Sequence, residues 1–329
     1  MKKSIVALAV SSAALASVSA YAAEDTSVDF YGNIQYAYSS DTSAGTNFQD
    51  NGSTLGVKGE SKVTDDITAF FKYELEFKAD QQDGRGGDSS YNESKLDQAY
   101  VGVKGGFGKV TVGTHDTIYN NAIQDAVDQF EYLGMSSAKG SSQGDTITYF
   151  SPSMSGFEVQ VALQTKGTDT TSGDDSTDNP NQEAGYISGN AGMAVLKYSN
   201  DLMSVAVGYD SRENTDKDDP KSTSGIAVTV TPMDNLSVTA KYETQEDTKD
   251  FLGLAARYGY GMGDVYGSYT NVNVDSSQTD NDSYNEYAVG VTYSVNSSMY
   301  TYFEIGNFGS AKEDVGSHTT SVVGVTYVF

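Results

Sequence analysis

The last nine residues of the chain alternate without interruption between two faces. Ser321, Val323, Val325, Tyr327 and Phe329 fall on one side of this segment, and the residues between them fall on the other. Because a β-strand has a period of two residues, the segment is predicted to be strand as far as its terminal aromatic residue. The last residues of soluble domains usually fray, and a terminal phenylalanine in water is a liability. The pattern therefore indicates a strand whose outer face meets something other than water.

The same alternation recurs along the chain in about sixteen segments of roughly 8 to 12 residues. In residues 67–78, for example, Phe71 and Leu75 lie on the apolar face, while Lys72 and Glu74 lie on the other. Short connections such as 64–66 alternate along the chain with long, mostly acidic ones such as 79–94 and 166–183. We therefore predict an all-β fold, an antiparallel up-and-down transmembrane β-barrel of about 16 strands, with short periplasmic turns and long extracellular loops.

A closed barrel is expected because only closure removes the unpaired strand edges that lipid does not tolerate. The alternative is a secreted, soluble all-β protein such as a tandem sandwich. That fold packs one apolar face on another and would need Greek-key crossovers instead of nearest-neighbour turns. The dense polar faces, such as the row from Lys72 to Lys78, favour a water-filled lumen.

Residues 1–22 are predicted to be a cleaved secretory signal peptide. Lys2 and Lys3 precede an apolar run at residues 5–16, which is too short for a membrane-spanning helix, and 20–22 is a small-x-small cleavage site. Residues 23–329 then form a single barrel domain. The sequence has no cysteine, and 45 acidic groups face 20 basic ones, a net charge of −25. This composition excludes disulfides and thiolate chemistry, and it argues against nucleic acid as a partner.

Five segments resemble the general diffusion porins of Gram-negative outer membranes. They are VDFYGNIQ (28–35), LGVKGE (55–60), AYVGVKGGFGKVTVG (99–113), YFSPSMSGF (149–157) and VTYVF (325–329). The resemblance implies a homotrimer in the cell outer membrane, in contact with lipid and lipopolysaccharide, through which small hydrophilic solutes diffuse passively. In VTYVF it also implies an assembly signal, Tyr327 and Phe329, that the outer-membrane assembly machinery reads.

The third long connection, residues 115–144, is much longer than an ordinary loop. Apolar residues in 122–132 recur near helical spacing, so a helix is predicted there. In the family, this loop folds into the barrel and narrows the pore, while an extracellular lid is the alternative. The acidic residues expected at the constriction are Asp116, Asp125, Asp128 and Glu131.

Family porins usually face this loop with a ladder of basic residues, and this chain departs from that pattern. The usual basic positions align with Asn33, Thr54 and Asp97. Other residues expected on the lumen wall are Lys58, Lys72, Glu74 and Lys95. Each lysine is interpreted either as part of an ion pair with Glu60, Glu74 or Asp97, or as a contact for solutes. Net negative walls predict a cation-selective pore.

No enzyme, cofactor or metal site is predicted. Residues 140–144 read G-x-S-x-G, but this pattern precedes a strand in a Gly/Ser-rich loop, and the two histidines, His115 and His318, are not placed near it. Two rival functions stay open. A substrate-specific channel, for sugars for example, needs an aromatic path along the lumen, and Phe70 and Phe150, which share the inward parity of their strands, are too few to form one. A surface adhesin or receptor would use the acidic loops.

Overall fold

The computed structural model describes residues 26–80, 94–141, 143–166, 189–212, 221–278, 283–311 and 316–329. The predicted signal peptide and Arg85 lie outside these residues. The strands are β1 (Thr26–Asp41), β2 (Gly45–Asp50), β3 (Ser53–Thr64), β4 (Ile67–Phe77), β5 (Lys95–Gly105), β6 (Gly108–Thr114), β7 (Thr146–Phe150), β8 (Phe157–Lys166), β9 (Gly189–Ser199), β10 (Met203–Asp210), β11 (Thr223–Met233), β12 (Leu236–Gln245), β13 (Lys249–Gly259), β14 (Asp264–Val274), β15 (Tyr284–Ser294), β16 (Met299–Phe308) and β17 (His318–Val328).

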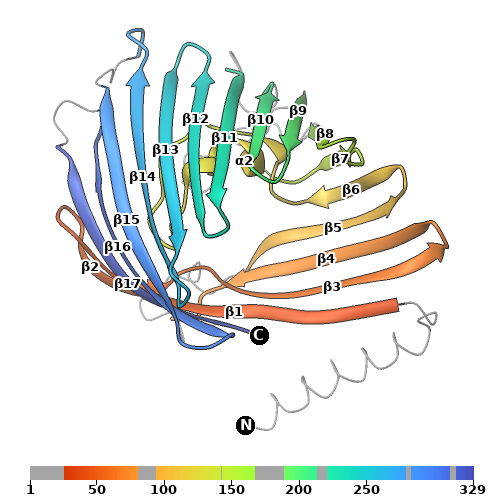
Figure 1. Cartoon of the computed structure of the whole chain (residues 1–329), viewed down its shortest axis with the longest axis horizontal. Coiled ribbons are helices and arrows are strands. Elements are labelled where there is room, and N and C mark those ends of the chain that lie inside the picture. Colours follow the sequence, from red (N-terminus) through yellow and green to blue (C-terminus); the bar gives the residue numbers. More distant parts are fainter. Residues whose placement is uncertain are drawn as a thin grey trace, which may run out of the picture.

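The strands form one closed antiparallel barrel of 16 strands, because β2 and β3 are two pieces of one barrel strand (Figure 1). Each strand from β4 to β16 pairs with its neighbours in the sequence, β3 pairs with β4 and β1, and β17 closes the barrel by pairing with β1. The closing register runs from Asn33 opposite Val328 to Asp41 opposite Thr320. Phe329 extends this pairing, since its N–H and C=O bond to Gly32 at 3.0 Å each. The predicted strand is thus confirmed to the end of the chain.

One strand of the barrel is broken into two pieces, which the alternation did not predict. Both β2 and β3 pair with β1, and residues 51–52 separate them. The Asp50 carboxylate accepts the backbone N–H groups of Gly52, at 2.9 Å, and Ser53, at 3.1 Å, and Gly52 has a φ of +87°. This local turn gives the chain an alternative to the strand ladder, so the pairing is interrupted there.

The two faces of the sheet differ as the alternation predicts. Apolar side chains such as Val207, Leu252 and Val323 are exposed on the outside, while Thr270 and Thr326 are buried on the inside. Exposed tyrosines lie toward both ends of the outer face, and examples are Tyr209, Tyr242, Tyr287, Tyr258, Tyr293 and Tyr327. Amphipathic rings of this kind suit the two membrane interfaces. Among the described residues, no helix is long and apolar enough to cross a membrane.

The apolar core lies inside the barrel, where the connection between β6 and β7 packs against the wall. Ile118, Tyr119 and Ile123 of this connection are buried against residues of β8, β9, β10 and β11. Leu133 and Met135 are buried against β1, β15, β16 and β17, and Ala138 against β13 and β14. Figure 1 shows the helix of this connection on the concave side of β9 to β12. The fold therefore places residues 118–138 on the inner side of the barrel wall.

Candidate functional site

The loop inside the barrel begins with two short helical pieces, α2 (Ile118–Ala122) and η2 (Gln124–Val127). Thr117 caps α2, since its hydroxyl accepts the backbone N–H of Asn120 at 3.1 Å. The helix predicted at residues 122–132 is therefore wrong in its extent. It overlaps η2, and residues 128–132 are not helical.

Contacts with the barrel wall explain why the helix ends early. Carbonyl groups that a continuing helix would use are taken by wall side chains: Val127 O accepts from Ser268 at 2.6 Å, and Gln129 O accepts from Arg257 at 3.2 Å. The backbone N–H groups of Glu131 and Tyr132 donate to Glu304 instead of to the preceding turn. Since the wall satisfies these groups, the loop runs extended along it without losing hydrogen bonds.

Four buried carboxylates of the wall hold this extended stretch. Glu304 accepts the N–H groups of Glu131, Tyr132 and Leu133 at 2.6, 3.1 and 2.9 Å. The other three accept from positions further along the loop, namely Glu286 from Ser136 N (2.8 Å), Glu243 from Ala138 N (3.0 Å) and Asp210 from Ser141 N (2.7 Å). We call Asp210, Glu243, Glu286 and Glu304 the anchor carboxylates. Hydrogen bonds to charged groups contribute about 1.5–3 kcal/mol each, so together they fix the path of the loop.

Close packing adds to this attachment. Ile123 and Val127 are fully buried, and burial of such side chains contributes about 1.5–3 kcal/mol each. The wall offers glycine where these side chains approach. A Cβ at Gly225 would lie 2.4 Å from Cγ2 of Ile123, and one at Gly253 would lie 2.8 Å from Cγ2 of Val127. Larger residues at these two positions would push the loop toward the lumen axis.

Three of the four acidic residues predicted at the constriction remain open to the lumen to some degree, and the fourth bonds to the wall. Asp125 is exposed, Asp116 and Asp128 are half-buried, and Glu131 accepts the Tyr300 hydroxyl at 2.8 Å. Desolvation inside the barrel, together with the charges of Asp128 and Asp116, raises the pKa of the Asp125 carboxyl to about 6. Desolvation also raises the pKa of Asp128. The loop thus presents carboxylates whose charge is partly suppressed by their surroundings.

The wall facing the loop carries a pair of lysines on β3 and β4. Lys58 and Lys72 are directly opposite each other in the β3–β4 register, and their Nζ atoms lie 5.2 and 5.6 Å from the centre of the Tyr31 ring. Lys72 is 3.1 Å from Glu74, as one of the two interpretations expected. Glu60 instead pairs with Lys104, at 2.5 Å, and not with Lys58. Like charges in direct opposition repel, and the ring face and Glu74 offset this.

The other predicted wall residues are placed as follows. Asn33 and Thr54 are opposite each other and share a hydrogen bond of 3.1 Å. Asp97 lies at an irregularity in the β4–β5 pairing, and Lys95 is exposed at the start of β5. A chain of side chains links this wall to the root of the loop, since Lys72 donates to Gln98 at 3.0 Å and Gln98 donates to Asp116 at 3.1 Å.

The sequence reasoning missed an aromatic cluster on the same wall. The rings of Phe70 and Tyr100 are 6.3 Å apart, and Tyr100 is 5.7 Å from His115. His115 lies at the root of the loop, where its Nε2 contacts the hydroxyls of Thr111 and Thr148. Tyr31 and Tyr100 have the inward parity of their strands, which was a signal in the sequence, but only phenylalanines were counted. The anchor carboxylates were missed because parity does not reveal which inward groups the loop covers.

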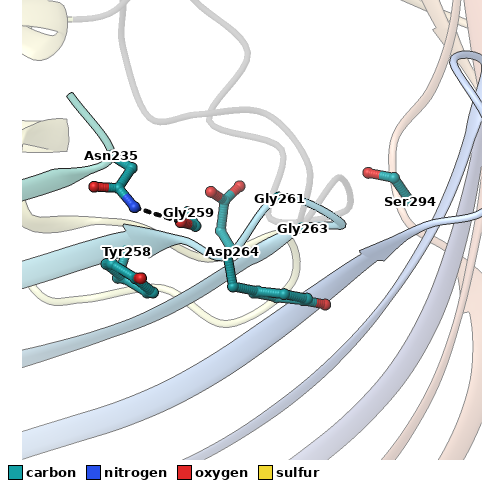
Figure 2. A pocket seen from close by; sticks show the side chains of 8 residues that line it. Asn235, Tyr258, Gly259, Gly261, Gly263, Asp264 and Ser294 are labelled. Atoms are coloured by element: carbon teal, nitrogen blue, oxygen red, sulfur yellow. Dashed lines mark hydrogen bonds between the residues drawn. The ribbon is translucent and has the colours of Figure 1, made fainter.

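A cavity of about 690 Å³ lies among the short turns, at one end of the barrel (Figure 2). Its lining residues are Asn235, Tyr258, Gly259, Tyr260, Gly261, Gly263, Asp264 and Ser294. Asp264 pairs with Arg257 at 3.1 Å, and Arg257 also donates to the loop carbonyl of Gln129. Arg257 therefore connects the lining of this cavity to the loop, and its guanidinium group is not free in the lumen.

Within the described parts of the chain, no group of three or more His, Asp or Glu residues could hold a metal ion. The serine of the G-x-S-x-G pattern, Ser142, lies outside the described residues. The His318 Nε2 atom is 3.8 Å from Asp41 Oδ2, at the end of the barrel away from the short turns.

Comparisons with known proteins agree with this architecture. The sequence model of the family described as Gram-negative porin matches residues 5–329. The chain is 32% identical to a "Monosaccharide porin" of a Halomonas species and to a "Major outer membrane protein" of Halomonas elongata, and each match covers 100% of both chains. Among solved structures, "Salmonella typhi OmpF complex with Daunomycin" superposes with a TM-score of 0.72 over 92% of this chain and 97% of that one, at 18% identity. The last likeness concerns the fold alone.

Proposed function

Because the chain belongs to the Gram-negative porin family, whose members are channels of the outer membrane, we propose that it lets small hydrophilic solutes and ions diffuse with a preference for cations. The observation that carries this proposal is the loop at residues 115–145, which the anchor carboxylates hold inside the lumen. Such a loop narrows the passage and brings its carboxylates close to every passing ion.

The preference for cations rests on the charges that face each other across the lumen. Six carboxylates of the loop and of the wall at β4 and β5 outnumber the five basic groups near them. The carboxylates are Asp116, Asp125, Asp128, Glu131, Glu74 and Asp97, and the basic groups are Lys58, Lys72, Lys95, Lys241 and Arg257. A passage some ten ångströms across is about one Debye length wide at physiological salt. Fixed negative charge in a low-dielectric barrel therefore raises the local concentration of cations.

Current recordings in a planar bilayer test the channel. We expect stepwise currents that grow with salt concentration without saturating, and swelling of protein-loaded liposomes in small neutral sugars and polyols. Absence of any current from the folded protein would contradict the proposal and would favour a surface adhesin or receptor.

A channel with some specificity for sugars is the second candidate, and one observation favours it. The cluster of Phe70, Tyr100 and His115 forms an aromatic surface on the lumen wall, and a relative that matches the whole chain is named "Monosaccharide porin". Sugar rings stack on aromatic faces by apolar contact. Reduction of the ion current by millimolar monosaccharide, and its loss in Tyr100→Ala, would distinguish this candidate from a general pore.

We further propose that the chain is cleaved after residue 22 and assembles as a homotrimer. The outer-membrane assembly machinery would recognise it, and the folded protein would contact lipopolysaccharide. Phe329 is 54% exposed on the outer face while its backbone closes the barrel on Gly32, which suits an end read by an assembly factor. Deleting Phe329 should reduce outer-membrane insertion and leave export intact. Normal amounts of heat-modifiable trimer from the truncated chain would argue against this role.

A further inference from the structure

A second cavity, of about 570 Å³, lies at the end of the lumen opposite the short turns. It is enclosed by three segments that are far apart in the sequence: the hairpin of β1 and β2, the bend of the loop at residues 132–134, and the facing ends of β16 and β17. Two hydrogen bonds tie the hairpin to β17, namely Thr42 N to Thr319 O at 3.0 Å and Thr319 N to the Thr42 hydroxyl at 2.9 Å. The walls are therefore held in place before any solute arrives.

We propose that this cavity binds a neutral polyhydroxylated solute of monosaccharide size. Its polar lining consists of the hydroxyls of Ser39, Thr46 and Thr320, the amide of Asn47 and the phenol of Tyr132. The Thr320 hydroxyl donates to Asp41 and the Tyr132 hydroxyl to Ser39, so a solute would meet Thr320 as an acceptor. The rings of Phe308 and His318 stand side by side, with centres 5.6 Å apart, and provide an apolar surface for the C–H face of a sugar. The inference rests on the proposed passage of small solutes for its purpose, although binding can be measured without transport.

Charged solutes fit this cavity poorly. No lysine or arginine is among the described residues that line it, so an anion finds no counterion there. The Asp41 carboxylate is already occupied. One of its oxygens accepts Ser43 N (2.7 Å), the Ser43 hydroxyl (2.6 Å) and Ala44 N (2.9 Å), and the other accepts the Thr320 hydroxyl. A cation would have to compete with these bonds.

The His318 side chain is placed to form a hydrogen bond with a hydroxyl group of the solute. Its Nε2 is 3.8 Å from Asp41 Oδ2, which is too long for a hydrogen bond, and its side chain is 36% exposed. A neutral imidazole offers one donor and one acceptor, the combination that a sugar hydroxyl matches.

Gly134 provides a substitution that blocks the cavity without removing a polar partner. It lines the cavity, its φ lies outside the left-handed region, and the nearest atom to a Cβ built on it is Asp128 Oδ2 at 3.6 Å. A leucine at this position therefore fits the backbone and fills part of the space.

The test is saturation-transfer NMR of D-glucose with the purified full-length protein. We expect signals from the sugar ring protons, and an apparent affinity at least about tenfold lower in Gly134→Leu, Phe308→Ala and His318→Ala. Phe150→Ala is the matched control, because Phe150 also faces the lumen but lies near the short turns, and it should bind as the wild type does.

Gluconate and glucosamine, which are charged molecules of similar size, should bind more weakly than glucose. Equal binding of either would overturn the neutral ligand class, and unchanged glucose signals in Gly134→Leu would overturn the site. KCl conductance of the same variants separates this inference from the proposed function, because a blocked cavity should leave a conducting channel.

Discussion

The lumen has two walls that carry acidic residues with the same inward parity but treat them differently. On β10, β12, β15 and β16, the anchor carboxylates are buried and accept the backbone N–H groups of the loop. On β4 and β5, Glu74 is also buried but pairs with Lys72 of its own wall at 3.1 Å, and Asp97 is half-buried. The difference lies in the partners, which are backbone N–H groups of the loop on one wall and neighbouring side chains on the other.

An inward carboxylate therefore either holds the loop or pairs with side chains of its own wall, according to whether the loop lies over it. The negative charges of the anchor carboxylates are offset by the N–H dipoles of the loop that point at them. The loop itself brings other carboxylates to the surface of the lumen. Three variants should separate the two kinds of group.

Loss of an anchor should have the largest effect. Glu304→Ala leaves the N–H groups of Glu131, Tyr132 and Leu133 and the Tyr266 hydroxyl without their acceptor, and each unsatisfied group costs about 1–3 kcal/mol. We expect a detached loop, with a larger single-channel conductance, faster proteolysis at residues 128–141 and a lower melting temperature.

Glu76→Ala is the matched control on the other wall, since Glu76 faces inward on β4 and pairs with the exposed Lys78 at 3.1 Å. It should change conductance and melting little. Equal effects of the two variants would remove the distinction between the walls.

An intermediate effect is expected from titration of Asp125. Because its pKa is raised to about 6, the carboxyl carries its charge above that pH and becomes neutral as the pH falls through it. Cation selectivity should therefore decrease between pH 7 and pH 5, before ordinary carboxylates are protonated. In Asp125→Asn this step should be smaller, and a wild-type selectivity that is flat over this range would contradict the assignment.

The smallest effect is expected from Lys58. Its Nζ lies over the Tyr31 ring, so Lys58→Gln removes one positive charge from the open wall. Screening limits the influence of a single lumen charge, and we expect a rise in the cation-to-anion permeability ratio of less than about twofold. Lys104→Gln, at the short-turn end and paired with Glu60, should give a smaller rise, and the reverse order would count against the placement of the constriction.

The sequence predicted the barrel well and the loop only in outline. Alternation gave the strands, because each inward or outward position is fixed by the pleat, and it failed at residues 51–52, where Asp50 bonds to the local backbone. The helix at 122–132 was misjudged because Glu304, Ser268 and Arg257, which are distant in the sequence, take its backbone groups. The aromatic cluster and the anchors depend in the same way on which strands face each other across the lumen.

The zero-current potential across a KCl gradient tests the central claim, that the loop carboxylates select the ions. The wild type should be cation-selective, and the triple variant Asp125→Asn, Asp128→Asn and Glu131→Gln should lose most of that selectivity while it keeps a heat-modifiable barrel. An anion-selective wild type, or a triple variant whose potential equals that of the wild type, would contradict the account.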